Sequence, residues 1–327
     1  MLLFFVIVLF VELGSDRVRA ELERKVFMDN CIEIRGVDKF YGRKQALKNV
    51  NLTIHQGMFG LLGRNGAGKT TLMKTLATLH CKKNGSITVC GIPIEQAKEI
   101  RSMTGYLPQD FSMYPSMTVQ ESLDYLGVLS GMDKQLRKER ITLLLKRVNL
   151  TEHRRKKVKA LSGGMKRRLG IAQALLHDPK VLIVDEPTAG LDPEERIRFR
   201  NLLCEVAEER IVILSTHIVG DIEATCEDIA IMNDGEILWQ GTVSELIQGA
   251  AGKVFTVNVP KKYLPQIRQQ FIITGMLVQS EYTTVRIISE NVPDLQGIAA
   301  AEPNVEDAYM YCLYQNGCDI SISGGEE

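Results

Sequence analysis

One segment of the chain has the residue types and spacing of a phosphate-binding loop. Residues 63–70 read GRNGAGKT, which fits the pattern G-x-x-x-x-G-K-[ST]. The glycines let successive backbone N–H groups converge on phosphate oxygens, and a helix that starts here adds positive potential. In this pattern Lys69 reaches the β- and γ-phosphates and the Thr70 hydroxyl binds Mg²⁺. An apolar strand precedes the segment and a helical pattern follows it, so a nucleotide site is favoured over a chance glycine turn.

A second glycine-containing segment, LSGGMKRR at 161–168, also introduces a helical pattern. Ser162, Gly163 and Gly164 stand where the first N–H groups of that helix are free to bind an anion. Taken alone, the segment is also compatible with an ordinary glycine-rich helix start. The LSGGM segment therefore predicts a second anion-binding site only together with the phosphate-binding loop at 63–70.

Two acidic residues end a continuous apolar run, VLIVDEP at 181–187. A run of this length and character is typical of a strand that is covered on both faces. Asp185 at its end can hold Mg²⁺ through water, and Glu186 can polarise an attacking water. The alternative is that the two acids merely cap the end of the strand and take no part in chemistry.

The elements that must position these residues alternate along the chain. This alternation predicts an α/β sheet with a helical insertion at about 111–176. On the helix expected at 70–79, Leu72, Leu76 and Leu79 share one face. Strands are expected at 32–37, 52–54, 58–62, 86–92, 103–107, 181–187, 211–215, 229–232 and 236–240, and helices at 70–79, 95–101, 118–130, 133–148, 165–176 and 193–209.

The C-terminal quarter reads as a separate small α/β module. The stretch GAAG marks a linker at 249–253, and the module follows at 254–320, with a frayed tail at 321–327. Strands are expected at 254–259 and 283–288, and a helix at 261–271. A further helix at 304–314, capped by Asn304, places one apolar face inward, formed by Val305, Ala308, Tyr309, Cys312 and Leu313.

Composition excludes several classes of protein. The chain has 327 residues, of which 45% are apolar and 24% charged, as in ordinary globular proteins. Forty Lys and Arg balance 40 Asp and Glu, so no basic excess supports general nucleic-acid binding. Seven cysteines without C-x-x-C spacing indicate buried thiols in a reducing cytosol rather than disulfides or zinc. The basic cluster at 154–159 is interpreted as a solvated face.

The first residues, 1–28, do not fit the pattern of the rest. The apolar run MLLFFVIVLFV has 11 residues, fewer than the roughly 20 that a spanning helix needs. It also lacks the positive segment that begins a secretory signal. We interpret 1–28 as an extension, with a start at Met28 as one explanation and a weak membrane-surface anchor as the alternative.

These motifs together give the chain its family resemblance. Over roughly 29–248 it resembles the ATPase subunits of ABC transporters, whose fold is a P-loop α/β domain with a nested helical subdomain. Lys69 and Ser162 are 93 residues apart, and Glu186 and His217 are 31 apart, which fits that family. The motifs follow in order: the phosphate loop, YLPQD with Gln109, LSGGM, VLIVDEP, AGLD at 189–192 and STH with His217.

The resemblance implies a role for each matching residue. Glu186 is similar to the family's general base, and His217 to the histidine that steadies the γ-phosphate and the attacking water. Gln109 resembles the glutamine whose loop links Mg²⁺ to the helical subdomain. Thr70, Gln109 and Asp185 are the expected Mg²⁺ ligands, and Gly190, where many relatives have serine–alanine before Leu-Asp, is expected to loosen its loop. The residues expected to bind ATP are Tyr41 (stacking on adenine), Gly63, Arg64, Asn65, Gly66, Ala67, Gly68, Lys69, Thr70, Thr71, Ser162, Gly163, Gly164 and Asp192.

The resemblance also implies partners. In this family two ATPase units pack head to tail, each ATP lying between one phosphate loop and the other unit's LSGGM segment, so we expect a homodimer or a paired ATPase subunit. MFGLLGRNGAGKTTLMKTLATL and EPNVEDAYMYCL resemble the exporter subgroup with small, separately encoded permeases, of the bacitracin, anthracycline and sodium-efflux types. A separate permease is expected to dock at Phe111, Met113 and Tyr114, which could instead be plain subdomain core. The chain is then cytoplasmic and peripheral on the inner face of the membrane.

Two rival readings remain from other classes. A soluble ABC ATPase that remodels ribosomes or other assemblies is disfavoured. Translation-type members usually carry two ATPase units per chain, and DNA-repair members separate the phosphate loop from LSGGM by long coiled coils, for which 93 residues leave no room. A non-hydrolysing regulatory subunit is disfavoured because Lys69, Glu186 and His217 are all present. No nucleic-acid partner is expected.

Overall fold

The computed structural model describes residues 30–320, so the predicted extension at 1–28 and the predicted tail at 321–327 lie outside the described part. This part forms two compact units. The first contains residues 30–58 and 70–214, and the second contains residues 59–69 and 215–320. Within residues 30–320, no helix is long and apolar enough to cross a membrane.

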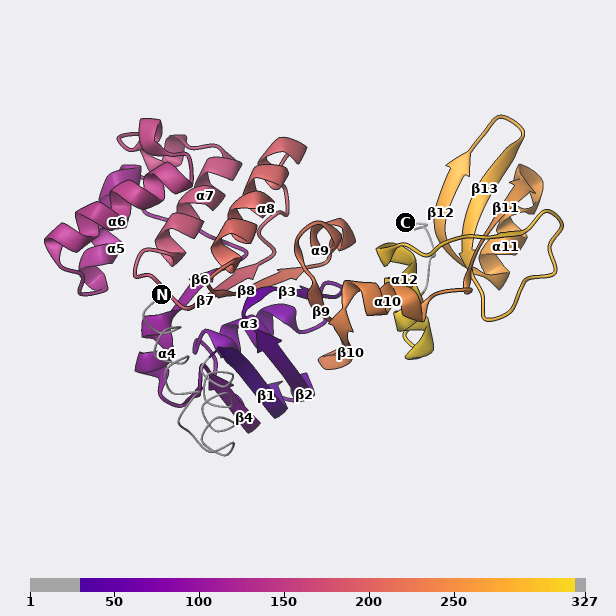
Figure 1. The fold of residues 1–327 in the computed structure, drawn as a ribbon, viewed down its shortest axis with the longest axis horizontal. Helices are drawn as coiled ribbons and strands as arrows, with labels where there is room; N and C mark the ends of the chain where they lie inside the picture. Colours follow the sequence, from indigo (N-terminus) through magenta and orange to yellow (C-terminus); the bar gives the residue numbers. More distant parts are fainter. Residues whose placement is uncertain (1–29, 321–327) are drawn as a thin grey trace, which may run out of the picture. The chain divides into compact units, whose positions relative to one another are not determined.

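An antiparallel sheet of order β2-β1-β4-β5 begins the first unit (Figure 1). Ile32 and Ile34 point into the core, each at most 2% exposed. The second strand is much longer than the predicted 52–54, because its polar first half pairs with the preceding strand and thereby satisfies its backbone groups. The strands are β1 Cys31–Tyr41, β2 Lys44–His55, β4 Asn84–Val89 and β5 Ile92–Pro93.

A six-stranded sheet has the order β10-β9-β3-β8-β7-β6. Its strands are β3 Gly57–Leu62, β6 Thr104–Leu107, β7 Val181–Asp185, β8 Ile211–Thr216, β9 Asp228–Asn233 and β10 Glu236–Thr242. β6 runs parallel to β7 and β3 parallel to β9, whereas β9 and β10 form an antiparallel pair. Every residue of β7 and β8 is buried. For β7 the apolar run at 181–187 predicts this burial.

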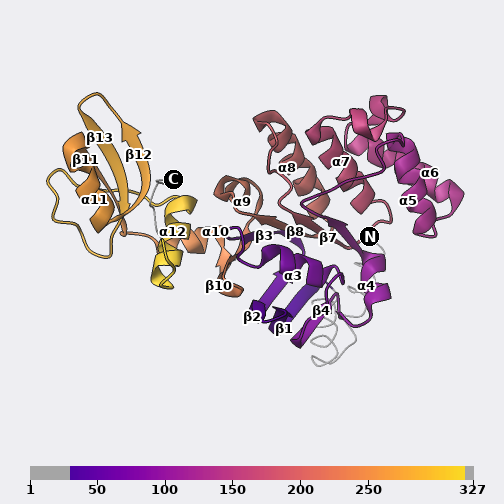
Figure 2. The same cartoon turned by 180° about the vertical axis from the view of Figure 1, so that it is seen from behind.

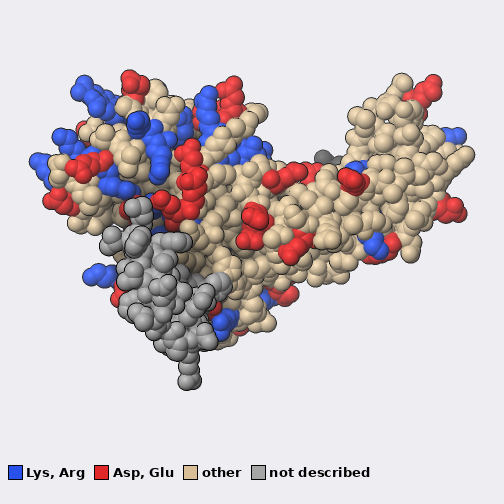
Figure 3. All heavy atoms as spheres, viewed as in Figure 1, with Lys and Arg blue, Asp and Glu red and all other residues tan. Residues whose placement is uncertain are grey.

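The predicted helical insertion is present between β6 and β7. Its helices are α5 Val119–Leu129, α6 Lys134–Arg147 and α7 Gly163–Ala174, with 3-10 turns η1 Thr151–His153 and η2 Val158–Ala160. Thr118, Asp133 and Ser162 cap the three helices through their side chains. Lys and Arg side chains gather over this region, intermixed with acidic ones (Figure 3). The basic residues of the 154–159 cluster are all exposed, as expected for a solvated face.

The helix that follows the phosphate loop, α3 Lys69–Leu76, ends earlier than predicted. Thr78 has φ +58, so the chain leaves the right-handed helical conformation before Leu79. The prediction that Leu79 shares one helix face with Leu72 and Leu76 was therefore wrong: those two are buried, whereas Leu79 is 56% exposed. Outside the C-terminal region, the other helices within residues 30–320 are α4 Ala97–Met103, α8 Pro193–Ala207, α9 Val219–Thr225 and α10 Val243–Gly249.

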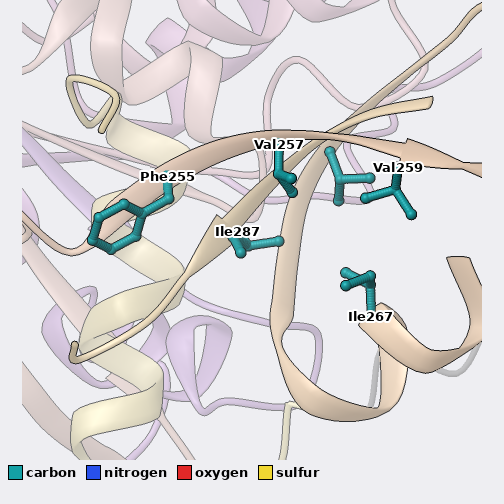
Figure 4. Close-up of a cluster of buried hydrophobic side chains, with 6 residues drawn as sticks. Phe255, Val257, Val259, Ile267 and Ile287 are labelled. Carbon is teal, nitrogen blue, oxygen red and sulfur yellow. The ribbon is translucent and has the colours of Figure 1, made fainter. Parts of the chain in front are cut away.

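The C-terminal region forms its own antiparallel sheet, of order β12-β13-β11-β14. The strands are β11 Val254–Pro260, β12 Ile272–Val278, β13 Tyr282–Ile288 and β14 Ala299–Ala300. A 3-10 turn, η3 Lys261–Tyr263, leads into α11 Leu264–Gln270, which covers one face of the sheet (Figure 2). Ile267 of α11 belongs to the same buried cluster as Phe255 and Val259 of β11 and Ile287 of β13 (Figure 4).

The last helix, α12 Val305–Gln315, packs against α10. Asn304 caps it in a capping box with Asp307, as the sequence predicted for the cap. The five apolar residues predicted to face inward are all buried. Asp307 is fully buried and pairs with Arg286 of β13, which joins the helix to the sheet.

Candidate nucleotide-binding and catalytic site

The phosphate loop leaves the end of β3 and lies in the second compact unit up to Lys69. The Gly63 N–H donates to the Thr216 carbonyl, 3.3 Å away. A Cβ at Gly63 would lie 2.2 Å from the Met232 carbonyl oxygen, so no larger residue fits. Gly66 and Gly68 have φ +85 and +109, conformations that glycine adopts readily and other residues do not. Three glycines of the motif are thus required by local geometry.

The side chain of Lys69 is folded into the loop itself. Its Nζ donates to the carbonyl oxygens of Gly63 at 2.6 Å and Arg64 at 3.1 Å. The residue is 4% exposed. The Ala67 N–H also donates to the Arg64 carbonyl, at 3.1 Å, so one carbonyl organises both the turn and the cation. Lys69 thus supplies the positively charged side chain that the pattern of a phosphate-binding loop requires.

His217 directly follows β8 and belongs to the same compact unit as the loop. Its side chain is exposed. The neighbouring Thr216 fixes this turn, because its hydroxyl accepts the Ile218 N–H at 3.0 Å while its carbonyl accepts that of Gly63. One residue therefore joins the base of the phosphate loop to the predicted γ-phosphate histidine.

In the first unit, the two predicted acids end the buried strand β7. Asp185 is fully buried and Glu186 is 4% exposed. Glu186 has φ +48, a left-handed conformation that costs a non-glycine residue about 1 kcal/mol or more. Strained residues of this kind are common at catalytic positions, which agrees with the base role predicted for Glu186.

Gln109 is exposed, and its backbone is held by the helix that carries the LSGGM segment. Arg167 of α7 donates to the carbonyls of Gln109 at 2.5 Å and Pro108 at 3.4 Å. Burial lowers the pKa of Arg167, while the carboxylates of Asp110 and Asp185 oppose that shift. Arg167 thus holds the backbone of the glutamine loop, and the charge of Asp185 at the end of β7 acts on it. Sequence reasoning missed this residue, although it stands only a few positions after Ser162.

Burial, and then the charge of the nearby Asp185, raises the pKa of Tyr106. The phenol of Tyr106 is therefore neutral.

The LSGGM segment presents an open edge at the start of α7. Ser162 is exposed and its hydroxyl accepts the Met165 N–H at 3.2 Å. Gly163 is exposed, and a Cβ there would meet no atom within 4 Å. Gly164 is instead buried against Glu195, whose Oε2 would lie 2.6 Å from a Cβ. The two glycines therefore differ: Gly164 packs the start of α7 against α8, whereas Gly163 leaves the predicted anion cradle accessible.

The AGLD loop ends at the helix cap of α8. The Asp192 carboxylate accepts the Glu195 N–H at 2.9 Å, so it stabilises the helix as well as standing at the predicted interface. Gly190 has φ +74 with open space around its Cα. The sequence suggested looseness at Gly190; the structure shows a specific left-handed turn that glycine permits.

Tyr41 ends β1, and the residue is 44% exposed. The Lys39 Nζ lies 5.3 Å from the ring centroid, and the His80 ring meets it edge-on at 5.6 Å. Burial, followed by the charges of Lys39 and Lys74, lowers the pKa of His80. An exposed aromatic face beside cationic groups fits a site for an adenine ring and its phosphates.

The predicted metal ligands suit Mg²⁺ by their chemistry. Thr70, Gln109 and Asp185 offer a hydroxyl, an amide and a carboxylate, and all three belong to the first unit. Mg²⁺ prefers such oxygen donors and keeps part of its shell as water and phosphate. In residues 30–320 no cluster of three or more His, Cys, Asp and Glu suggests a site for another metal.

Known proteins share these features. The ABC transporter family model matches residues 47–189. The uncharacterized ABC transporter ATP-binding protein YxlF of Bacillus subtilis is 41% identical over 71% of this chain and 77% of its own length. The Nod factor export ATP-binding protein I of Cupriavidus pinatubonensis is 37% identical, covering 68% and 69%. The linearmycin resistance ATP-binding protein LnrL of Bacillus subtilis is 35% identical, covering 68% and 72%.

Solved structures agree with these relatives. The dimeric structure of MJ0796, a bacterial ABC transporter cassette, superposes with a TM-score of 0.59 at 27% identity, covering 64% of this chain and 98% of the cassette. CbiO1 of Clostridium perfringens, part of the ABC transporter complex cbiONQ, gives a TM-score of 0.62 at 27% identity, covering 74% and 96%.

The fold and the site define an ATP-hydrolysing ABC cassette, extended by a C-terminal antiparallel sheet. The chain belongs to the ATP-binding subunits of ABC transporters and is homologous to exporter-type ATPases. The predictions of the cassette fold and of ATP hydrolysis are confirmed.

Proposed function

We propose that the chain hydrolyses ATP to drive a separate membrane permease that exports a drug, antibiotic, lipid or ion. The observation that carries the proposal is a cavity of about 690 Å³ beside the glutamine loop. Phe111, Met113 and Tyr114, the predicted docking residues, all line it. The direction of transport is proposed from the relatives that act in Nod factor export and linearmycin resistance.

The cavity suits a short amphipathic helix of a permease. Tyr114 is 58% exposed and meets Tyr125 of α5 edge to face, with ring centroids 5.7 Å apart. Large exposed aromatic side chains around a hollow are typical of protein-binding surfaces. Asp110, one residue after Gln109, also lines the cavity, so a permease helix bound there would lie next to the glutamine loop.

We assign the chemistry to the residues as follows. The loop N–H groups and Lys69 bind the phosphates, Tyr41 holds the adenine, and Glu186 accepts the proton of the attacking water while His217 orients that water. Thr70, Gln109 and Asp185 would hold Mg²⁺, which neutralises charge on the phosphate oxygens. The other proposed nucleotide contacts are Gly63, Arg64, Asn65, Gly66, Ala67, Gly68, Thr71, Ser162, Gly163, Gly164 and Asp192.

The accessible start of α7 supports a dimer in which each nucleotide is shared. Ser162 and Gly163 of one copy would complete the site of the other, in a homodimer or with a paired ATPase subunit. We further propose a cassette at 29–248 and a C-terminal domain at 254–320, joined at 249–253. With the permease, the chain would lie in the cytoplasm against the inner face of the membrane.

Affinity purification from gently solubilised membranes, followed by mass spectrometry, tests the permease. We expect a polytopic membrane protein to co-purify with the wild type and to be lost with Tyr114→Ser. Leu143→Ser is the control, because Leu143 is 51% exposed on α6 and does not line the cavity. Recovery of ribosomal or other soluble partners without a membrane protein would favour the remodelling ATPase instead.

Glu186→Gln tests the proposed base. The variant should still bind ATP, accumulate as a dimer and lose turnover. Glu194→Gln is the control, since the Glu194 side chain is 82% exposed on α8. Unchanged hydrolysis by Glu186→Gln would remove Glu186 as the base.

A further inference from the structure

We infer that the basic cluster at 154–159 binds the anionic lipid headgroups of the membrane in which the permease lies. The cluster consists of five residues that are all exposed: Arg154, Arg155, Lys156, Lys157 and Lys159. The inference rests on the proposed function for the position of the membrane. It adds to that function a second surface, besides the cavity, through which the cassette contacts the membrane.

The backbone of the basic cluster is held against the rim of the cavity. The Lys159 N–H donates to the carbonyl of Pro115, at 3.1 Å, and Pro115 lines the cavity. The Val158 N–H donates to the carbonyl of Met117 at 2.9 Å. The Val158 side chain is only 4% exposed, so it anchors the segment while the cations on either side of it face water. All of these residues belong to the first compact unit, as the cavity does.

Positive charge is concentrated at this point of a chain whose net charge is zero. Within 146–159 the only acid is Glu152, against seven Lys and Arg. In the part of the chain that the structure describes, none of the five cluster side chains forms an ion pair. Hydrogen bonds from Thr118 lower the pKa of Glu121, and the charge of Lys157 contributes less. The Glu121 carboxylate caps α5 by accepting the Thr118 N–H at 2.8 Å, so the cluster keeps its charge for a partner.

The exposure of the cluster fits a charged surface better than a single bound anion. None of the five side chains lines the cavity, and Lys and Arg lie spread over the outside of this region (Figure 3). The inner leaflet of a membrane carries anionic lipids, which attract clusters of four to eight Lys and Arg within about one Debye length, roughly 10 Å. A permease helix in the cavity would bring the leaflet to the face on which the cluster lies.

Sedimentation of the full chain with phospholipid vesicles, in the absence of a permease, tests the inference. The wild type should bind vesicles that contain phosphatidylglycerol and not vesicles of phosphatidylcholine alone. Binding should be lost as salt rises from about 0.1 M to 1 M, because the Debye length shrinks from about 10 Å to about 3 Å.

A double variant, Lys156→Gln combined with Lys157→Gln, should weaken binding to phosphatidylglycerol vesicles. The expected loss is roughly tenfold to thirtyfold, since each cation at an anionic surface contributes about fivefold. The matched control is Lys261→Gln combined with Lys262→Gln, which removes the same charge from two adjacent exposed lysines of the C-terminal region. The control should bind these vesicles within about twofold of the wild type, because the inference places the contact at 154–159.

Three results would overturn the inference. The first is binding that ignores salt and lipid charge, which would assign the membrane contact to apolar residues. The second is an equal loss of vesicle binding in both double variants. The third is wild-type vesicle binding by the Lys156 and Lys157 variant together with loss of the co-purified membrane protein, which would assign the cluster to the permease. Absence of any co-purified membrane protein contradicts the proposed function instead, and the vesicle measurement decides the inference separately.

Discussion

Asp307 fastens α12 to the C-terminal sheet, and we expect Asp307→Ala to loosen this attachment. The carboxylate is fully buried. It accepts the Arg286 Nε at 2.7 Å, the Thr274 hydroxyl at 2.5 Å and the Asn304 N–H at 2.9 Å. The Arg286 Nη2 is also within ion-pair distance, at 2.5 Å. The substitution removes all of these contacts at once.

The expected loss is about 3–5 kcal/mol, the usual cost of breaking a buried ion pair by removing one partner. The individual hydrogen bonds are not summed, because contacts that share one carboxylate are not additive. The Arg286 side chain is 25% exposed, so water can reach part of the abandoned guanidinium. We therefore expect the lower half of this range.

Amide hydrogen exchange of the full chain, resolved to peptides from β13 and α12, measures the local effect. Protection there should fall by roughly a hundredfold to a thousandfold, at 1.4 kcal/mol per factor of ten. Glu306→Ala is the matched control: Glu306 is exposed in the same helical turn, and its loss should cost at most about 1 kcal/mol.

The reasoning fails if Asp307→Ala reduces protection no more than Glu306→Ala does. A second comparison guards against a trivial loss of the helix cap. Arg286→Met combined with Asp307→Ala should be less destabilised than Asp307→Ala alone, because no charge is then left buried without its partner.

Three further substitutions test other parts of the chain. Burial opposes ionisation of Asp178, but the hydrogen bonds and charges of Arg210 and Arg140 outweigh it and lower its pKa. The Asp178 carboxylate therefore stabilises the fold above its unfolded pKa of about 3.9, and this stabilisation is lost as the pH falls through its lower pKa in the folded chain. The difference in urea midpoint between wild type and Asp178→Asn should be constant from about pH 5 to 7 and disappear in acid. Gly190→Ala should lower stability by about 1 kcal/mol in thermal unfolding because of its φ of +74, whereas Gly190→Asn should cost less. Arg167→Met releases the carbonyls of Pro108 and Gln109, and phosphate-release assays should show a lower kcat with little change in the KM for ATP.

The parts of the molecule that short patterns specify could be predicted from the sequence. The phosphate loop, the buried strand ending at Asp185 and the Asn304 cap each depend on neighbouring residues, and their elements lie close to the predicted ranges. The end of α3 could not be placed, because a positive φ at Thr78 has no signature in the residue type. The first half of β2 was missed because pairing with β1, rather than apolar periodicity, makes it a strand.

Contacts between distant residues could not be predicted either. Arg64 and Asp319 are 255 positions apart, and nothing in either local sequence points to the other. Asp307 and Arg286 are separated by 21 residues and meet only because α12 packs against the sheet. Motif spacing thus predicts which residues form the nucleotide site, while the contacts of Arg64 with Asp319 and of Arg167 with the glutamine loop required the folded chain.

Because the backbone at Glu186 is left-handed, the residue that would make the fold most stable at this position differs from the residue expected to serve catalysis. Glycine, and next asparagine, adopt a φ of +48 with less strain than glutamate. A selection for heat resistance alone should therefore enrich Gly or Asn at position 186, while a selection for growth that depends on transport should restore Glu. Variants selected for heat resistance would then carry Gly or Asn in place of Glu186 and would lose ATP turnover. The loss would follow from the same left-handed conformation that positions the Glu186 carboxylate.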